Sequence, residues 1–103
     1  MRRTVHVKKC HPEAFDAIRK GYKQFEWRKE DDCTYAVGDT IMLLEYEPPP
    51  DDPPDVLDET MYGYTGEIEK RLITYVLRDR FDMPKGFVVL QLGAGAPPSK
   101  VRP

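Results

Sequence analysis

The stretch Gly21-Tyr22-Lys23-Gln24-Phe25-Glu26-Trp27-Arg28-Lys29 decides how this chain is organised. Its glycine can end a helix, and residues 23–28 alternate in the manner of a strand. The alternation places Phe25 and Trp27 on one face, which we expect to face the core rather than to serve as a stacking platform. Gln24, Glu26 and Arg28 then face outward. The density of charged and aromatic side chains makes this stretch the candidate functional site.

The residues before this stretch predict one strand and one short helix. Residues 3–9 alternate, with Val5 and Val7 forming the apolar face of a half-buried strand. Pro12 suits the first turn of a helix, and Gly21 supplies its stop. The apolar stripe of this helix comprises Ala14, Phe15, Ala17 and Ile18.

Three further strands are predicted downstream, over residues 40–47, 67–77 and 87–92. We expect a bulge in the second of them near Lys70 and Arg71. Between the first two, residues 47–59 hold six acids and five prolines. Such a composition buries little apolar surface, so it predicts an exposed acidic, proline-rich loop at 47–60.

The order of elements is therefore β-α-β-β-β-β. At 103 residues with 40% hydrophobic content, the chain is expected to form a single domain over residues 1–92, followed by a flexible tail at 93–103. The predicted fold class is α+β. Short antiparallel strands with one helix close most economically into a small, mostly antiparallel β-barrel capped by that helix.

The net charge of −2 conceals an asymmetry along the chain. Residues 1–30 carry nine Lys and Arg against four Asp and Glu, whereas residues 31–103 carry seven against fourteen. A general nucleic-acid coat needs a broadly basic domain, so the composition argues against one. It permits a basic pocket confined to the first third of the chain.

Other functional classes find little support. Cys10 and Cys33 are too few for a disulfide framework or a zinc site, and neither His6 nor His11 has companions at metal-ligand spacing. Cys10 is a weak candidate nucleophile, and no glycine-rich phosphate loop or cofactor motif is present. No apolar run approaches the roughly 20 residues that span a bilayer. We therefore expect a cytoplasmic protein without metal, cofactor or membrane contact.

The run Gly21-x-Lys23-x-x-Glu26-x-Arg28 resembles the signature of ASCH domains, members of the PUA-like superfamily. The resemblance extends over residues 4–92, to a family of unassigned function related to the ASCH domains. It is carried also by Pro12-Glu13-x-Phe15-Asp16-Ala17-Ile18, Val37-Gly38-Asp39, Glu45-Tyr46, Tyr64-Thr65-Gly66 and Gly86-Phe87-Val88-Val89-Leu90. It implies a PUA-like barrel with a ligand cleft between helix and sheet, and RNA or a modified nucleobase as ligand.

Some relatives are similar to amidohydrolases that deacetylate acetylated cytidine with a Lys, a Thr three residues later and a distant Glu. Lys23 matches that Lys, and Glu26 stands where the Thr is expected. A carboxylate cannot replace a hydroxyl as acyl acceptor without a more labile intermediate. A hydrolase acting on a modified nucleoside or on RNA, with Lys23 and Glu26 as acid and base, therefore remains an alternative to simple binding. A protein-interaction module built on the acidic loop is the second alternative.

Lys23 is the residue on which the binding hypothesis depends. On a regular strand, Lys23 and Glu26 point to opposite faces, so they meet only if Lys23 belongs to the turn or a bulge intervenes. Without such a meeting, Lys23 is a solvated lysine. Glu26 and Arg28 share a face, so they can form an ordinary surface ion pair. Alternatively, Glu26 can accept a hydrogen bond from the exocyclic amine of a base, and Arg28 can bind phosphate or stack on a base. The full set of candidate ligand-binding residues is Lys23, Glu26, Arg28, Glu45, Tyr46, Tyr64 and Thr65.

Overall fold

The computed structural model describes residues 3–31, 33–51 and 61–95. Its elements follow the predicted order, as β1 (Val5–Cys10), α1 (Pro12–Arg19), β2 (Phe25–Lys29), β3 (Thr40–Glu47), β4 (Gly63–Arg78) and β5 (Phe87–Gly95). The strand predicted at 40–47 is confirmed in both bounds. β5 continues to Gly95, so residues 93–95 belong to a strand and not to the predicted tail. Most of the predicted acidic loop, and the tail from residue 96, lie outside the described residues.

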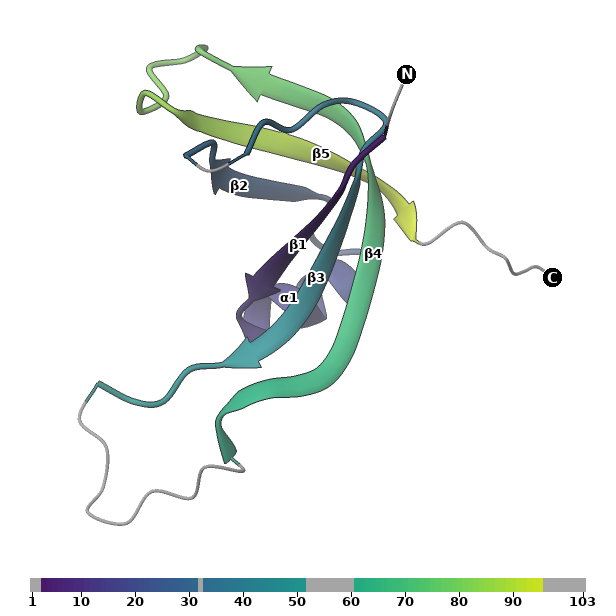
Figure 1. The fold of residues 1–103 in the computed structure, drawn as a ribbon, viewed down its shortest axis with the longest axis vertical. Coiled ribbons are helices and arrows are strands. Elements are labelled where there is room, and N and C mark those ends of the chain that lie inside the picture. Colours follow the sequence, from purple (N-terminus) through teal and green to yellow (C-terminus); the bar gives the residue numbers. More distant parts are fainter. Residues whose placement is uncertain (1–2, 32, 52–60, 96–103) are drawn as a thin grey trace, which may run out of the picture.

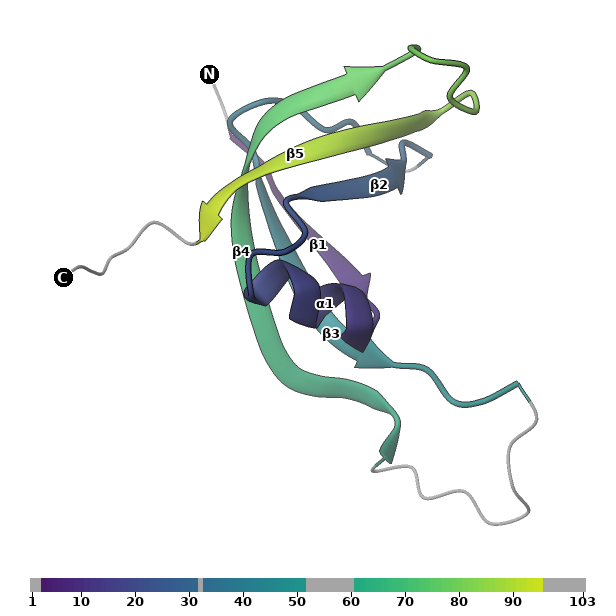
Figure 2. The same ribbon diagram turned by 180° about the vertical axis from the view of Figure 1, so that it is seen from behind.

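The five strands form one sheet in the order β1-β3-β4-β5-β2. The pairing of β1 with β3 is parallel, and the other three pairings are antiparallel. Figures 1 and 2 show the sheet curled into a half-barrel, with α1 against its inner face. The α+β class and the mostly antiparallel, barrel-like sheet are thus confirmed.

β4 makes the curl possible because it belongs to both halves of the sheet. Residues 63–72 pair with β3, and residues 71–78 pair with β5. The register with β5 shifts between Arg71 and Ile73 and again between Ile73 and Tyr75. Irregular pairing of this kind increases local twist and bends a strand. The bulge predicted near Lys70 and Arg71 is therefore present slightly further along β4.

The core lies between α1 and the inner face of the sheet. α1 contributes Phe15 and Ile18, and it ends where Gly21 adopts a φ of +84°, a conformation that glycine reaches without strain. The strands contribute the buried side chains of Ile41, Leu43, Ile73, Val88, Leu90 and Leu92. Among the described residues, no helix is both long and apolar enough to cross a membrane.

The two edge strands face the opposite way from the prediction. Val5 and Val7 are 56% and 54% exposed, whereas the neighbouring His6 is buried. Phe25 and Trp27 are 50% and 48% exposed, while only 4% of Glu26 is accessible. The prediction that Phe25 and Trp27 belong to the core is therefore wrong.

The reason for this inversion is that the polar faces of both edge strands find partners inside. His6 Nε2 lies 2.9 Å from Asp39 Oδ2, and the His6 ring packs against Tyr35 at a centroid distance of 4.6 Å. Glu26 accepts hydrogen bonds from two cations. A buried charge is tolerated when it is paired and hydrogen-bonded, so hydrophobic alternation alone could not show which face is inside.

Candidate functional site

Lys23, Glu26 and Arg28 converge into what we call the charged cluster. Lys23 Nζ donates to Glu26 Oε1 at 3.0 Å, and Arg28 Nε donates to Glu26 Oε2 at 2.8 Å. A second Arg28 nitrogen, Nη2, lies 2.7 Å from the same Oε2. Both oxygens of the buried carboxylate are therefore charge-paired, and the cluster carries two positive charges against one negative charge.

The turn after α1 brings Lys23 into this cluster. The backbone N–H groups of Tyr22 and Lys23 both donate to the Ala17 carbonyl, at 2.9 and 3.1 Å. Lys23 thus still belongs to the helix end and precedes β2, so strand alternation does not govern its direction. The turn is the first of the two conditions under which Lys23 and Glu26 were expected to meet.

Arg28 also joins the two open edges of the sheet. Its Nη2 donates to the backbone carbonyl of Lys9 in β1 at 2.8 Å, although β1 and β2 are at opposite ends of the strand order. We call the line along which β1 and β2 approach each other the seam. The charged cluster therefore lies at the seam of the half-barrel.

Cys10 is buried next to the charged cluster. Burial raises the pKa of its thiol to about 11, and Glu26 and Glu45 add to the rise while Arg28 and Lys23 oppose it. A thiol with this pKa stays protonated at neutral pH and is a poor nucleophile. Cys10 is thus a buried, protonated side chain beside the charged cluster.

The other predicted ligand-binding residues form two separate groups. Glu45 faces Cys10 in the pairing of β3 with β1, and its Oε1 accepts a hydrogen bond from Thr65 Oγ1 at 2.7 Å. Tyr46 and Tyr64 pack edge to face, with ring centroids 5.0 Å apart. The Lys9 ammonium lies 4.4 Å from the Tyr46 ring, and alternation turns Lys9 away from Cys10. Glu45 and Thr65 thus lie toward the charged cluster, and the two tyrosines lie on the outer face.

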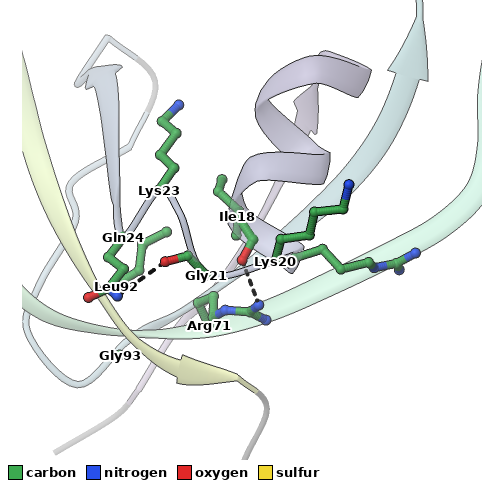
Figure 3. A pocket seen from close by; sticks show the side chains of 9 residues that line it. Ile18, Lys20, Gly21, Lys23, Gln24, Arg71, Leu92 and Gly93 are labelled. Atoms are coloured by element: carbon green, nitrogen blue, oxygen red, sulfur yellow. Dashed lines mark hydrogen bonds between the residues drawn. The ribbon is translucent and has the colours of Figure 1, made fainter.

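A pocket of about 390 Å³ adjoins the charged cluster at the end of α1. Lys23 is the member of the cluster that lines it, and Figure 3 shows its side chain extending away from Arg71 and Gly93. Arg71 Nη2 donates to the Ile18 carbonyl at 3.2 Å, which ties β4 to the helix end. The lining residues are Ile18, Arg19, Lys20, Gly21, Lys23, Gln24, Arg71, Leu92 and Gly93.

Residues 5–92 match the family model described as a domain of unknown function, DUF3850. The chain belongs to the DUF3850 family. No curated protein matches it. The charged cluster and all of the pocket except Gly93 lie within the matched part of this DUF3850 chain.

Two features of the candidate site in this DUF3850 chain were not predicted from the sequence. The first is the backbone carbonyl of Lys9, which accepts a hydrogen bond from Arg28 and which no side-chain pattern can reveal. The second is the pair Arg19 and Arg71, which line the pocket. Both donate hydrogen bonds to Glu69, at 2.7 and 2.6 Å. Arg19 was recognisable only as a favourable charge in the last helical turn. Among the described residues, no three His, Cys, Asp or Glu side chains form a group that could hold a metal ion.

Proposed function

We propose that this protein binds RNA or a nucleotide-like ligand at the charged cluster. The observation that carries the proposal is the convergence of Lys23 and Arg28 on the buried Glu26 at the seam. With two cations on one carboxylate, the cluster keeps a net positive charge, which favours an anionic ligand. The side chains of Lys23 and Arg28 remain 26% and 23% exposed, so both can still reach a ligand.

The cluster offers the two kinds of contact that a nucleotide needs. An ammonium has three donors and a guanidinium five, so Lys23 and Arg28 have donors beyond those that Glu26 and the Lys9 carbonyl accept. These donors suit phosphate oxygens. Glu26 Oε1 accepts one hydrogen bond from Lys23, and a carboxylate oxygen can accept a second, such as one from the exocyclic amine of a base. The resemblance of residues 21–28 to the ASCH signature supports the same class of ligand.

Titration of the isotope-labelled protein with short RNAs and nucleosides, followed by NMR, tests the proposal. We expect shifts concentrated at residues 21–28, and affinity that falls as salt rises because phosphates are contacted. Lys23→Ala and Arg28→Ala should weaken binding and each lower the salt slope by about one. Lys70→Ala, which changes an exposed lysine of β4, is the matched control. Unchanged spectra at residues 21–28 with every RNA and nucleoside would refute the proposal.

Hydrolysis is a second candidate because Lys23 Nζ and Glu26 Oε1 are only 3.0 Å apart. This geometry permits proton exchange between an acid and a base. Incubation with acylated nucleosides and with RNA, analysed by mass spectrometry, tests it. Activity that Lys23→Ala abolishes in a folded protein would support catalysis, and full activity of that variant would exclude the assigned roles.

A further inference from the structure

The outer face of β2, β5 and β4 carries a patch of exposed aromatic side chains. The strand registers align its members in rows, because Phe25 and Tyr75 both pair with Gln91, and Trp27 pairs with Val89. Phe25, Trp27 and Tyr75 are each about half exposed. We call the side chains of Phe25, Trp27, Tyr75 and Phe87 the aromatic face.

The aromatic rings lie close enough together to act as one surface. The Trp27 and Phe87 ring centroids are 5.7 Å apart and tilted by 43°. Phe25 and Trp27 are two residues apart on one strand, which separates them by ~7 Å. This spacing is about twice the ~3.4 Å advance per nucleotide of a stacked strand. Alternate bases of a stacked strand can therefore meet successive rings.

Cations border the aromatic face at both ends of β2. The Lys23 ammonium lies 5.4 Å from the Phe25 ring centroid, so the residue that contacts Glu26 also contacts the aromatic face. At the other end, Lys29 pairs with Phe87 on the same face. None of the paired residues in these rows is acidic: Phe25, Gln91, Tyr75, Trp27, Val89, Leu77, Lys29 and Phe87.

β2 is an edge strand, so its two faces meet at an open edge of the sheet. Alternation along the five residues of β2 places Glu26 and Arg28 on the inner face and Phe25 and Trp27 on the outer face. A flexible chain lying along this edge would meet Lys23 and Arg28 with one side and the aromatic rings with the other. Single-stranded nucleic acid has this division, with phosphates on one side and bases on the other.

We propose that the aromatic face stacks the unpaired bases of a single-stranded nucleic acid whose phosphates contact Lys23 and Arg28 around the β2 edge. This inference rests on the proposed function and names the form of the ligand. A protein partner fits the surface less well, because Lys23 and Lys29 border it and the paired residues of its rows include no acid, which suits a polyanion. Exposed aromatic side chains on a sheet are a sequence-tolerant platform for bases, so little preference among base sequences is expected.

Trp27 is the only tryptophan of the chain and serves as the reporter. Its fluorescence should be quenched by oligouridylate, because a stacked base contacts the indole directly. Inorganic polyphosphate of matched charge should leave the fluorescence unchanged, and duplex RNA should bind more weakly than the single strand. Absence of quenching at saturating oligouridylate would overturn the inference.

Anisotropy of labelled oligouridylate separates this inference from the proposed function. Trp27→Leu, which keeps an apolar contact with Phe87, and Tyr75→Ala should each weaken binding about tenfold. Val7→Ala, at a similarly exposed position of β1, is the control and should bind normally.

The outcomes distinguish the two proposals. Binding that needs Lys23 and Arg28 but survives Trp27→Leu and Tyr75→Ala would overturn the aromatic face alone. Binding that needs the aromatic residues but survives Lys23→Ala and Arg28→Ala would overturn the charged cluster alone. If no oligonucleotide binds, the aromatic face is overturned, and if no nucleoside binds either, both proposals are overturned. If light scattering then shows self-association that Trp27→Leu abolishes, the aromatic face mediates contacts between copies of the chain.

Discussion

Arg28 of β2 donates a 2.8 Å hydrogen bond to the carbonyl oxygen of Lys9 in β1, and so links the two edge strands of the curled sheet. The same guanidinium holds the buried Glu26 carboxylate. One side chain thus bridges the seam at one point and builds the charged cluster. Stability and the proposed ligand binding therefore both depend on this residue.

Arg28→Ala should therefore destabilise the fold. It leaves the buried Glu26 with Lys23 as its remaining cation and the Lys9 carbonyl without this donor. Breaking a buried ion pair from one side costs about 3–5 kcal/mol, and the retained Lys23 places the expected loss near the lower end. Urea unfolding followed by circular dichroism measures it. Arg80→Ala, in the exposed loop after β4, is the control, and an equal effect there would contradict the role of Arg28.

The inverted faces of β2 predict that substitution of Trp27 costs less stability than substitution of a smaller buried residue. Trp27→Ala should cost only about 1 kcal/mol, because half of the indole is already in water. Leu90→Ala, at the buried register partner of Glu26, should cost about 2–5 kcal/mol. Chemical denaturation of both variants compares them directly. A larger loss for Trp27 would mean that the indole belongs to the core after all.

Acid should destabilise the protein through Asp39. Burial alone would raise the pKa of this carboxyl, but hydrogen bonds from His6 and from the backbone N–H groups of Thr4 and Ala36 outweigh burial and lower it. A carboxyl whose pKa is lowered on folding contributes stability above its unfolded pKa of about 3.9, and that contribution is lost as pH falls through the folded pKa.

Urea unfolding at a series of pH values below about 5 measures this loss. Asp39→Asn should be less stable at neutral pH and should lose less stability on acidification. Glu30 and Glu69 also have lowered pKa values, Glu30 mainly through its hydrogen bonds with Arg78 and Glu69 through those with Arg19 and Arg71, which outweigh burial. A shallower but still measurable acid dependence should therefore remain in the variant. If stability depended on pH in Asp39→Asn as it does in the unmodified protein, Asp39 would not be a cause of the acid sensitivity.

Cys10 should resist alkylation in the folded protein. Its pKa of about 11 and its burial keep the thiolate scarce at pH 8, whereas Cys33 is partly exposed. Mass spectrometry after brief treatment with iodoacetamide should show label on Cys33 first. Labelling of Cys10 should appear when urea unfolds the chain. Rapid modification of Cys10 under native conditions would show that it is accessible and ionised.

Local patterns were sufficient for the elements and their order. Pro12 and Gly21 mark the helix, and the apolar run at the centre of β3 identifies a core strand, because these signals depend on neighbouring residues alone. The glycine that ends the helix also indicated where part of the candidate site lies, because Lys23 follows two residues later. The faces of β1 and β2 were predicted the wrong way round, because an alternating strand has two different sides and only its partners decide which is buried.

By itself, the sequence determined a β-α-β-β-β-β chain whose most charged and aromatic stretch follows the helix. Backbone propensities and the period of the side chains suffice for that. Tertiary structure alone decided that Glu26 lies inside and Trp27 outside. Two cations, one from a turn and one within β2, neutralise the carboxylate at the seam, and the curl of β4 brings the distant β1 edge close enough to share Arg28.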